Sequence, residues 1–195
     1  SICNNLSCNY ILYTKRRRIM NIFYLHSDPV KAAQIQYNKH VVKMILESAQ
    51  MLCTAHHHYA ELLDYDASYI PYKKAHYNHP STIWTRQNSR QYYWLFHHML
   101  GLGNEYTKRY GKKHLSITKC FDALKNCPVG MPLGGEFNEP PQAMPDEYKV
   151  PGCSITAYWN YYEGEKYTIA TKDEMLITRD KLYGTEKIIP TFDTA

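Results

Sequence analysis

The sequence lacks the features that most readily assign a protein to a familiar class. Its 195 residues include six cysteines, but no Cys-x-x-Cys pair and no zinc-finger spacing. It also has no glycine-rich phosphate loop and no Gly-x-Ser-x-Gly turn of the hydrolase type. No apolar run approaches the roughly 20 residues that a membrane span needs. We therefore expect reduced cysteines, a cytoplasmic location and no membrane partner.

Net positive charge is also small once the first 19 residues are set aside. Lys15, Arg16, Arg17 and Arg18 supply four of the five net positive charges, and no acidic residue precedes Met20. The remaining chain is nearly neutral, so overall basicity is weak support for a polyanionic partner. Residues 1–19 show no helical or strand period. We interpret them as upstream translated sequence before a natural start at Met20, with a basic targeting arm as the alternative.

The composition is that of an ordinary globular domain with an excess of tyrosine. Hydrophobic residues make up 44% and charged residues 21%, and there are 19 tyrosines. This length is enough for one buried core. We predict an all-α or nearly all-α fold, a compact multi-helix single domain over residues 20–170. A poorly specified tail follows at 171–195.

Capping residues and periodicity predict where the helices lie. Asp28 and Pro29 suit a helix start, and the first helix is expected from about Pro29 to His57. A second helical region opens at Pro80 or Ser89 and ends near Gly111. Two shorter helices are predicted at about 115–126 and, capped by Ser154, at about 155–162. A short buried strand or extended entry at 22–25 comes first, and residues 128–152 form a long Pro/Gly-rich loop.

The first predicted helix carries an unusually narrow polar band. Apolar side chains cover well over half of its circumference, which is the reverse of an ordinary surface helix. The band, which we call the polar strip, consists of Gln36, Lys39, His40, Lys43, Glu47 and Gln50. A solvated stripe with weak Lys–Glu contacts is one interpretation. The other is a cleft-facing site in which two amines, an imidazole and a carboxylate bind phosphate and transfer protons.

Other segments offer further candidates. The triplet His56-His57-His58 cannot act as one ligand set on a helix, because neighbouring side chains point in different directions. We therefore predict no metal site and no cofactor. Asn78-His79-Pro80 with Trp84 and Arg86 indicates either a turn with a core tryptophan or an aromatic platform that stacks a base and grips phosphate. In the long loop, Gln142, Tyr148 and Lys149 are positioned either to contact a ligand's edge or to cap the core.

From Met20 to about Ala170 the chain resembles a family of small uncharacterised proteins of tailed bacteriophages. The resemblance rests on Lys39-His40-Val41-Val42-Lys43-Met44 with Glu47, on Asn78-His79-Pro80 with Trp84, and on Pro140-Pro141-Gln142-Ala143-Met144-Pro145. More distantly it is similar to the phage pyrimidine-dimer DNA glycosylases, small helical enzymes with lyase activity. The residues concerned there are His79, Tyr93, Leu95, Glu105, Arg109 and Gly111, with the aromatic stretch from Tyr158 to Lys166.

That second resemblance implies a DNA base glycosylase with lyase-like chemistry. The nucleophile would be an amine of Lys39 or Lys43, or a free amine at Met20. Glu47 would stabilise the cationic sugar and His40 would move protons. The chain departs from the family's pattern, because Asn21 is too bulky for routine removal of Met20 and Glu47 is the only glutamate of its helix stretch.

We therefore expect an enzyme that acts on DNA or nucleotides, with Lys39, His40, Lys43 and Glu47 as catalytic residues. Gln50, His79, Trp84, Arg86, Gln142, Tyr148 and Lys149 would bind the ligand. Two alternatives stay open. One is a non-catalytic module that binds a nucleotide or a protein, and the other is an accessory or structural phage protein.

Overall fold

The structure is a computed structural model in which residues 20–170 are described. The regular elements of this part are all helices, so the predicted all-α class is confirmed. The expected leader at 1–19 and tail at 171–195 lie outside the described residues. In chain order the elements are α1 (Pro29–Gln34), α2 (Asn38–Leu63), α3 (Pro80–Thr85), α4 (Ser89–Tyr110), α5 (Leu115–Leu124), the 3-10 helix η1 (Asp146–Tyr148), α6 (Ser154–Gly164) and the 3-10 helix η2 (Lys166–Ile169).

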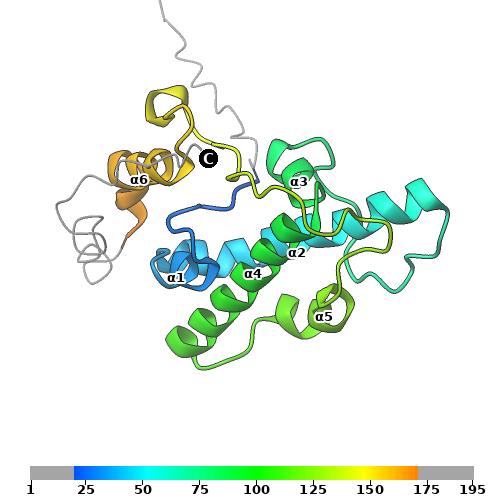
Figure 1. The fold of residues 1–195 in the computed structure, drawn as a ribbon. Coiled ribbons are helices and arrows are strands. Elements are labelled where there is room, and N and C mark those ends of the chain that lie inside the picture. Colours follow the sequence, from blue (N-terminus) through cyan, green and yellow to red (C-terminus); the bar gives the residue numbers. More distant parts are fainter. Residues whose placement is uncertain (1–19, 171–195) are drawn as a thin grey trace, which may run out of the picture.

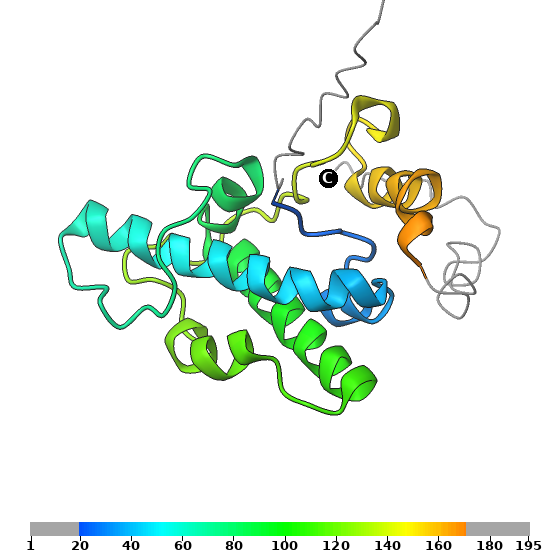
Figure 2. The same cartoon turned by 180° about the vertical axis from the view of Figure 1, so that it is seen from behind.

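The two longest helices, α2 and α4, cross each other and form the centre of the fold (Figure 1). Helix α1 packs along α4, while α3 and α5 contact both long helices. Figure 2 shows the same arrangement from behind, with α2 crossing the face of α4. Helix α2 contacts α3, α4 and α5, and most of its apolar sector is buried, whereas Val42 and Leu46 remain 38% and 39% exposed.

Local sequence signals account for several helix boundaries. The Asp28 side chain accepts hydrogen bonds from the N–H groups of Val30 and Lys31, and Pro29 occupies the first turn of α1. Gly111 ends α4 with φ of 72°, a left-handed conformation that glycine adopts without strain. The predicted start at Asp28 and the predicted stop near Gly111 are therefore confirmed.

The single first helix that the sequence predicts is divided in two. Residues 35–37 separate α1 from α2. The guanidinium group of Arg109, on α4, donates hydrogen bonds to the carbonyl oxygens of Gln34 at 2.9 Å and Gln36 at 2.7 Å. It also contacts the Asn38 side chain at 3.0 Å. A residue more than 70 positions away thus satisfies the carbonyls that a continuous helix would have satisfied itself.

Ser154 differs from its predicted role as a helix cap. It is the first residue of α6, and Cys153 precedes it as the capping position. The Ser154 hydroxyl donates to the carbonyl oxygen of Pro140, and its N–H donates to Glu139 at 2.8 Å. Its hydrogen bonds therefore fasten α6 to the long loop.

The expected entry at 22–25 is buried, but it turns at Phe23, whose φ is 55°, and no strand is assigned within residues 20–170. It runs between α6 and the pair α1 and α2 (Figures 1 and 2). The Trp159 indole on α6 donates to the carbonyl oxygen of Leu25 at 2.8 Å. The N-terminal segment, Met20–Leu25, is therefore the layer through which α6 joins the rest of the domain.

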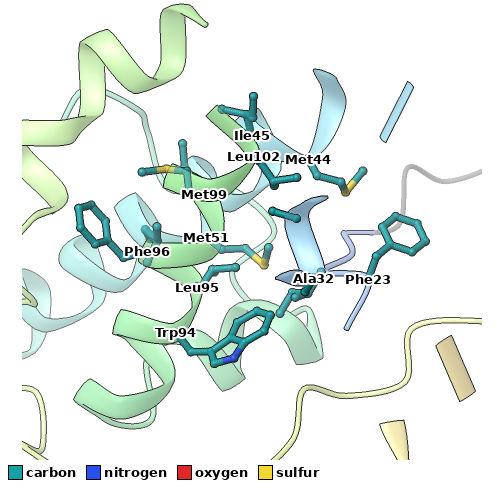
Figure 3. Packing of buried hydrophobic residues seen from close by; sticks show 14 of the residues in the cluster. Phe23, Ala32, Met44, Ile45, Met51, Trp94, Leu95, Phe96, Met99 and Leu102 are labelled. Atoms are coloured by element: carbon teal, nitrogen blue, oxygen red, sulfur yellow. The ribbon is translucent and has the colours of Figure 1, made fainter. Parts of the chain in front are cut away.

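Apolar side chains from α2, α4 and the N-terminal segment form one continuous core (Figure 3). Met44 and Met51 of α2 meet Leu95 and Met99 of α4, and all four are at most 2% exposed. Within residues 20–170, no helix combines the length and the apolar character that crossing a membrane requires.

Candidate functional site

The polar strip of α2 lies beneath other parts of the chain over much of its length. His40 and Glu47 are seven residues apart, about 10 Å along a helix axis. Both are buried, at 6% and 5% exposure, whereas Lys39 and Lys43 are exposed and Gln50 is partly buried. The covering layer is the N-terminal segment, with α6 beyond it. Two buried polar centres, one at Glu47 and one at His40, therefore flank the exposed Lys43.

Glu47 is held by contacts from its own helix and from the N-terminal segment. Its Oε2 atom accepts a hydrogen bond from the Asn21 backbone N–H at 3.2 Å. The Lys43 ammonium nitrogen lies 3.5 Å from Oε1, and the Lys43 side chain is 51% exposed. Burial raises the pKa of Glu47, while Lys43 and the Asn21 N–H act in the opposite direction. The carboxylate is thus a stronger base than an exposed glutamate, beside an amine that a ligand can reach.

Asn21 connects this centre to the long loop. Its side-chain amide donates to the carbonyl oxygen of Ala143 at 2.8 Å. The side-chain oxygen Oδ1 of Asn21 accepts from the backbone N–H groups of Ile22 and Phe23 at 2.8 and 3.0 Å. These bonds fix the turn in which Phe23 adopts φ of 55°. The backbone N–H that faces Glu47 is therefore part of a rigid arrangement.

His40 forms the second centre with Tyr162 of α6. The His40 Nδ1 atom lies 2.6 Å from the Tyr162 hydroxyl oxygen, and the Phe23 ring stacks on the imidazole at 4.0 Å. The Tyr162 oxygen also accepts from the Tyr37 N–H at 3.4 Å. Burial lowers the pKa of His40 to about 3, and the charges of Lys166 and Lys43 add to this effect. The ring is therefore neutral.

Several predicted binding residues have structural partners instead. Trp84 is 3% exposed, donates from its indole to the carbonyl oxygen of Asn138 at 2.8 Å and packs edge-on against Trp94 and Phe137. The buried indole is not available to stack a base, so the structure favours the core interpretation. Arg86 is 9% exposed. It donates to the Tyr77 carbonyl oxygen at 2.7 Å and lies 4.0 Å over the Tyr77 ring.

The remaining predicted ligand contacts also act locally. The His79 ring caps α3 by accepting from the Ser81 N–H at 3.1 Å. The Gln142 side chain bonds both the N–H and the carbonyl of Val150, which closes the long loop. Tyr148 lies against Tyr161, with ring centroids 5.3 Å apart, and Lys149 pairs with Asp146 at 2.8 Å on the surface.

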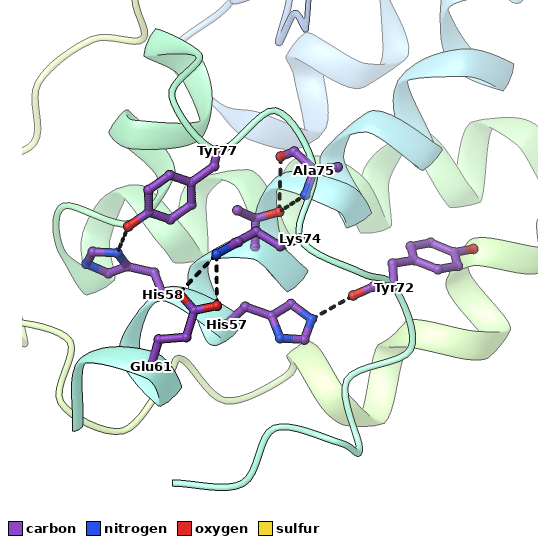
Figure 4. Close-up of polar contacts among 8 residues, drawn as sticks. His57, His58, Glu61, Tyr72, Lys74, Ala75 and Tyr77 are labelled. Carbon is purple, nitrogen blue, oxygen red and sulfur yellow. Dashed lines mark hydrogen bonds and ion pairs between the residues drawn. The ribbon is translucent and has the colours of Figure 1, made fainter. Parts of the chain in front are cut away.

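The three consecutive histidines near the end of α2 point to three different partners, as predicted. His56 meets the Tyr92 hydroxyl at 2.8 Å, His57 the Tyr72 carbonyl oxygen at 2.8 Å and His58 the Tyr77 hydroxyl at 2.6 Å. Figure 4 shows the last two contacts. Across residues 20–170, no group of three or more His, Cys, Asp or Glu side chains is arranged to hold a metal ion.

Sequence reasoning missed three residues that complete the strip. Asn21 and Tyr162 are the direct partners of Glu47 and His40, and Lys166 contributes positive charge near His40. The Tyr162–His40 contact joins residues 122 positions apart, so no local pattern could reveal it. A run of aromatic residues at 158–162 was the only signal, and it did not identify which ring would face α2.

Comparison of the chain with protein-family models, with curated proteins and with solved structures finds no match. The function is therefore argued from the chemistry of the strip. An accessible primary amine beside a buried carboxylate of raised pKa can exchange a proton with it and so become nucleophilic. A neutral imidazole nearby can donate or relay a proton.

Proposed function

We propose that this protein is a DNA-processing enzyme with glycosylase and lyase-like chemistry, in which Lys43 is the nucleophile. The observation that carries the proposal is the distance of 3.5 Å between the Lys43 amine and Glu47, a carboxylate that is itself buried. Lys39 is exposed one turn earlier, and no ion pair joins it to a residue of the described chain. Of the two lysines, Lys43 is therefore the better placed to be activated.

The simplest reaction of such a pair is with the open-chain aldehyde of an abasic site. Glu47 takes a proton from the Lys43 ammonium group, and the free amine adds to the aldehyde carbon C1′. The resulting carbinolamine loses water, with Glu47 returning the proton to the departing oxygen. The product is a protonated imine that links Lys43 to the sugar. Burial assists the first step, because it raises the pKa of Glu47.

His40 would serve this site as a neutral group. Its buried ring is held in place by the Tyr162 hydroxyl and the stacked Phe23 ring, and in this scheme it would relay a proton. The adjacent charges of Lys43 and Lys166 are both positive and favour an anionic ligand such as the DNA backbone. Trp84 has no part in this scheme, because its indole is buried.

The same positive charges also favour a second candidate, a module that binds a nucleotide without reacting. Lys43 and Lys166 both place positive charge near His40, and cations of this kind can bind a phosphate group. The two candidates differ in one respect. A binding module forms no covalent bond to an abasic site.

The experiment is borohydride trapping on DNA that contains an abasic site. Reduction converts an imine to a stable protein–DNA adduct, which migrates more slowly on a denaturing gel. Wild-type protein should form the adduct, Lys43→Met should not, and Lys39→Met is the matched control that should retain it. Glu47→Gln should form it at least tenfold more slowly, in keeping with the loss of a general base.

Two outcomes would reject the proposal. The first is the absence of any adduct with wild-type protein under conditions where a known lyase is trapped. The second is full trapping by Lys43→Met. Binding of the DNA without any adduct would favour the non-catalytic module.

A further inference from the structure

The connection between α4 and α5 gathers much of the positive charge of the described chain. Residues 20–170 hold 15 lysines and arginines against 13 acidic residues, so this part of the chain is nearly balanced. Residues 106–119, which we call the basic turn, hold five of the 15 and no acidic residue. The five are Lys108, Arg109, Lys112, Lys113 and Lys119. The rest of the described chain therefore has a small net negative charge, and its positive charge is concentrated at this turn.

Four of these five side chains are available to a partner. Arg109 pairs with Glu105 at 3.0 Å and donates to carbonyl oxygens at the start of α2, so it acts within the fold. The four lysines of the basic turn are all exposed, and no ion pair joins them to an acidic side chain within residues 20–170. Four unneutralised charges on one short segment favour a partner that carries several negative charges.

The backbone that carries these lysines is held in one conformation. Gly111 ends α4 in the left-handed region. The Tyr106 ring contacts Tyr110 before the turn and His114 after it, with ring centroids 5.1 and 5.0 Å apart. The His114 ring in turn caps α5 by accepting from the Ser116 N–H at 3.1 Å. The lysines therefore extend from a fixed surface, and binding requires little ordering of the backbone.

Contacts of Arg109 connect the basic turn to the start of α2, and so to the polar strip. The turn lies on the side of the domain away from α6 (Figures 1 and 2). Arg109 contacts Asn38, the first residue of α2, at 3.0 Å. Lys39 follows and is exposed, and the exposed Lys43 comes one turn later, about 6 Å along the helix axis. Exposed lysines therefore lie on both sides of the contact between Arg109 and Asn38.

We propose that the basic turn is a DNA-binding surface, which contacts the phosphate backbone of a duplex and keeps the duplex close to Lys43. The choice of DNA among polyanions rests on the proposed function. Lysine side chains are common partners of backbone phosphates. The exposed hydroxyl groups of Thr107, Tyr110 and Thr118 add neutral donors of the kind that also bind phosphate oxygens. Contacts of this type do not read the bases, so the surface binds duplexes of any sequence.

The test measures how tightly the full chain binds a short, undamaged, fluorescently labelled duplex, by anisotropy over a range of salt concentrations. The turn variant combines Lys112→Gln with Lys113→Gln. The matched control combines Lys73→Gln, in the loop after α2, with Arg90→Gln, at the start of α4, and so also removes two exposed charges. The turn variant should bind about tenfold more weakly near 0.1 M salt. The slope of log K against log salt concentration should be smaller by about two, since each phosphate contact contributes about 0.9.

The control variant should keep the affinity and the salt dependence of the wild-type protein. Equal losses in the two variants would show that only net charge matters, and would overturn the surface. Unchanged binding by the turn variant, or no binding of DNA by the wild-type protein, would also overturn it. Poly-glutamate that competes with DNA equally well at equal charge would point to an acidic protein partner instead of DNA.

Borohydride trapping separates this surface from the chemistry at Lys43. At saturating protein concentration the turn variant should trap abasic DNA as fast as the wild-type protein, because the turn holds DNA without reacting. At low protein concentration it should trap more slowly. If wild-type protein forms no adduct but the turn variant alone loses DNA binding, the proposed function fails and the surface stands. Trapping by wild-type protein together with unchanged DNA binding by the turn variant rejects the surface alone.

Discussion

Two buried histidine–tyrosine pairs lie on the same helix, one at each end of α2. His40 meets Tyr162 at 2.6 Å, and His56 meets Tyr92 at 2.8 Å. Burial lowers the pKa of both histidines, to about 3 for His40 and about 4 for His56. By distance, burial and protonation state the two pairs are nearly equivalent.

Their surroundings separate them. The Tyr92 hydroxyl donates a hydrogen bond to the carbonyl oxygen of Leu124 at 2.8 Å, so the His56 pair belongs to a chain of hydrogen bonds that links α2, α4 and α5. The His40 pair lies beside the charges of Lys43 and Lys166, next to the Glu47 centre. A buried polar pair therefore does not by itself mark a site. The positive charges of Lys43 and Lys166 beside His40 are the feature on which the proposal of a site at this pair rests.

The largest effect that both pairs share is acid sensitivity. The buried His98 has a pKa of about 4. When the pH is below 6.5, the ordinary histidine pKa, His40, His56 and His98 all take up protons as the protein unfolds. Their folded pKa values are depressed, so their contribution to stability is complete above pH 6.5 and falls as the pH drops toward 4. Within that pH range each histidine lowers the free energy of unfolding by about 1.4 kcal/mol for every pH unit that the pH falls.

Urea denaturation between pH 7 and 4.5 measures this slope. Glu47 acts in the opposite direction, because its raised pKa favours the folded state as it takes up a proton. We expect the free energy of unfolding to fall by about 3 kcal/mol per pH unit between pH 6 and 5. The three histidine contributions together outweigh the opposing one of Glu47. A free energy of unfolding that is flat over this range would contradict the neutral, buried state of the histidines.

Removing the hydroxyl of Tyr92 should give the next largest effect. In Tyr92→Phe, both the buried His56 Nε2 and the Leu124 carbonyl oxygen lose their shared partner. We expect a loss of about 2–4 kcal/mol in the free energy of unfolding, since each unpaired buried group costs about 1–3 kcal/mol. Trapping of abasic DNA by the folded protein should be unchanged. A drop in trapping would show that the two pairs are not functionally distinct.

Tyr162→Phe should have a smaller effect on stability and a larger one on function. The Tyr162 hydroxyl contacts His40 Nδ1 and the Tyr37 N–H, and the second bond is long at 3.4 Å. We expect a loss of about 1–2 kcal/mol, the usual cost of one unpaired buried group. The freed imidazole no longer has a fixed tautomer, so trapping should slow several-fold. Equal trapping by Tyr162→Phe and wild-type protein would remove His40 from the site.

The sequence predicts the helices better than it predicts how they meet. The cap at Asp28, the stop at Gly111 and the helices after Ser89 and Leu115 follow from local chemistry, and the structure confirms them. The break between α1 and α2 does not, because its carbonyls are satisfied by Arg109. The local periodicity of residues 29–57 cannot predict this contact, because Arg109 lies on another helix.

The candidate site divides in the same way. The width of the apolar sector of α2 predicted that His40, Lys43 and Glu47 would all be partly shielded from solvent. His40 and Glu47 are buried, but Lys43 is exposed. The width of the sector could not show that Asn21 and Tyr162 would do the shielding, since these contacts span 26 and 122 positions. Trp84 could belong to the core or to a ligand platform by sequence alone. Its bond to Asn138 decides for the core.

The central claim is that the amine beside Glu47 is the nucleophile, and mapping the trapped adduct tests it most directly. Wild-type protein reduced on abasic DNA is digested with a nuclease and a protease, and the modified residue is located by mass spectrometry. The account predicts a sugar remnant on Lys43, whose amine lies 3.5 Å from Glu47. A remnant on Lys39, on Lys166 or on any other amine, or no modified peptide at all, would contradict it.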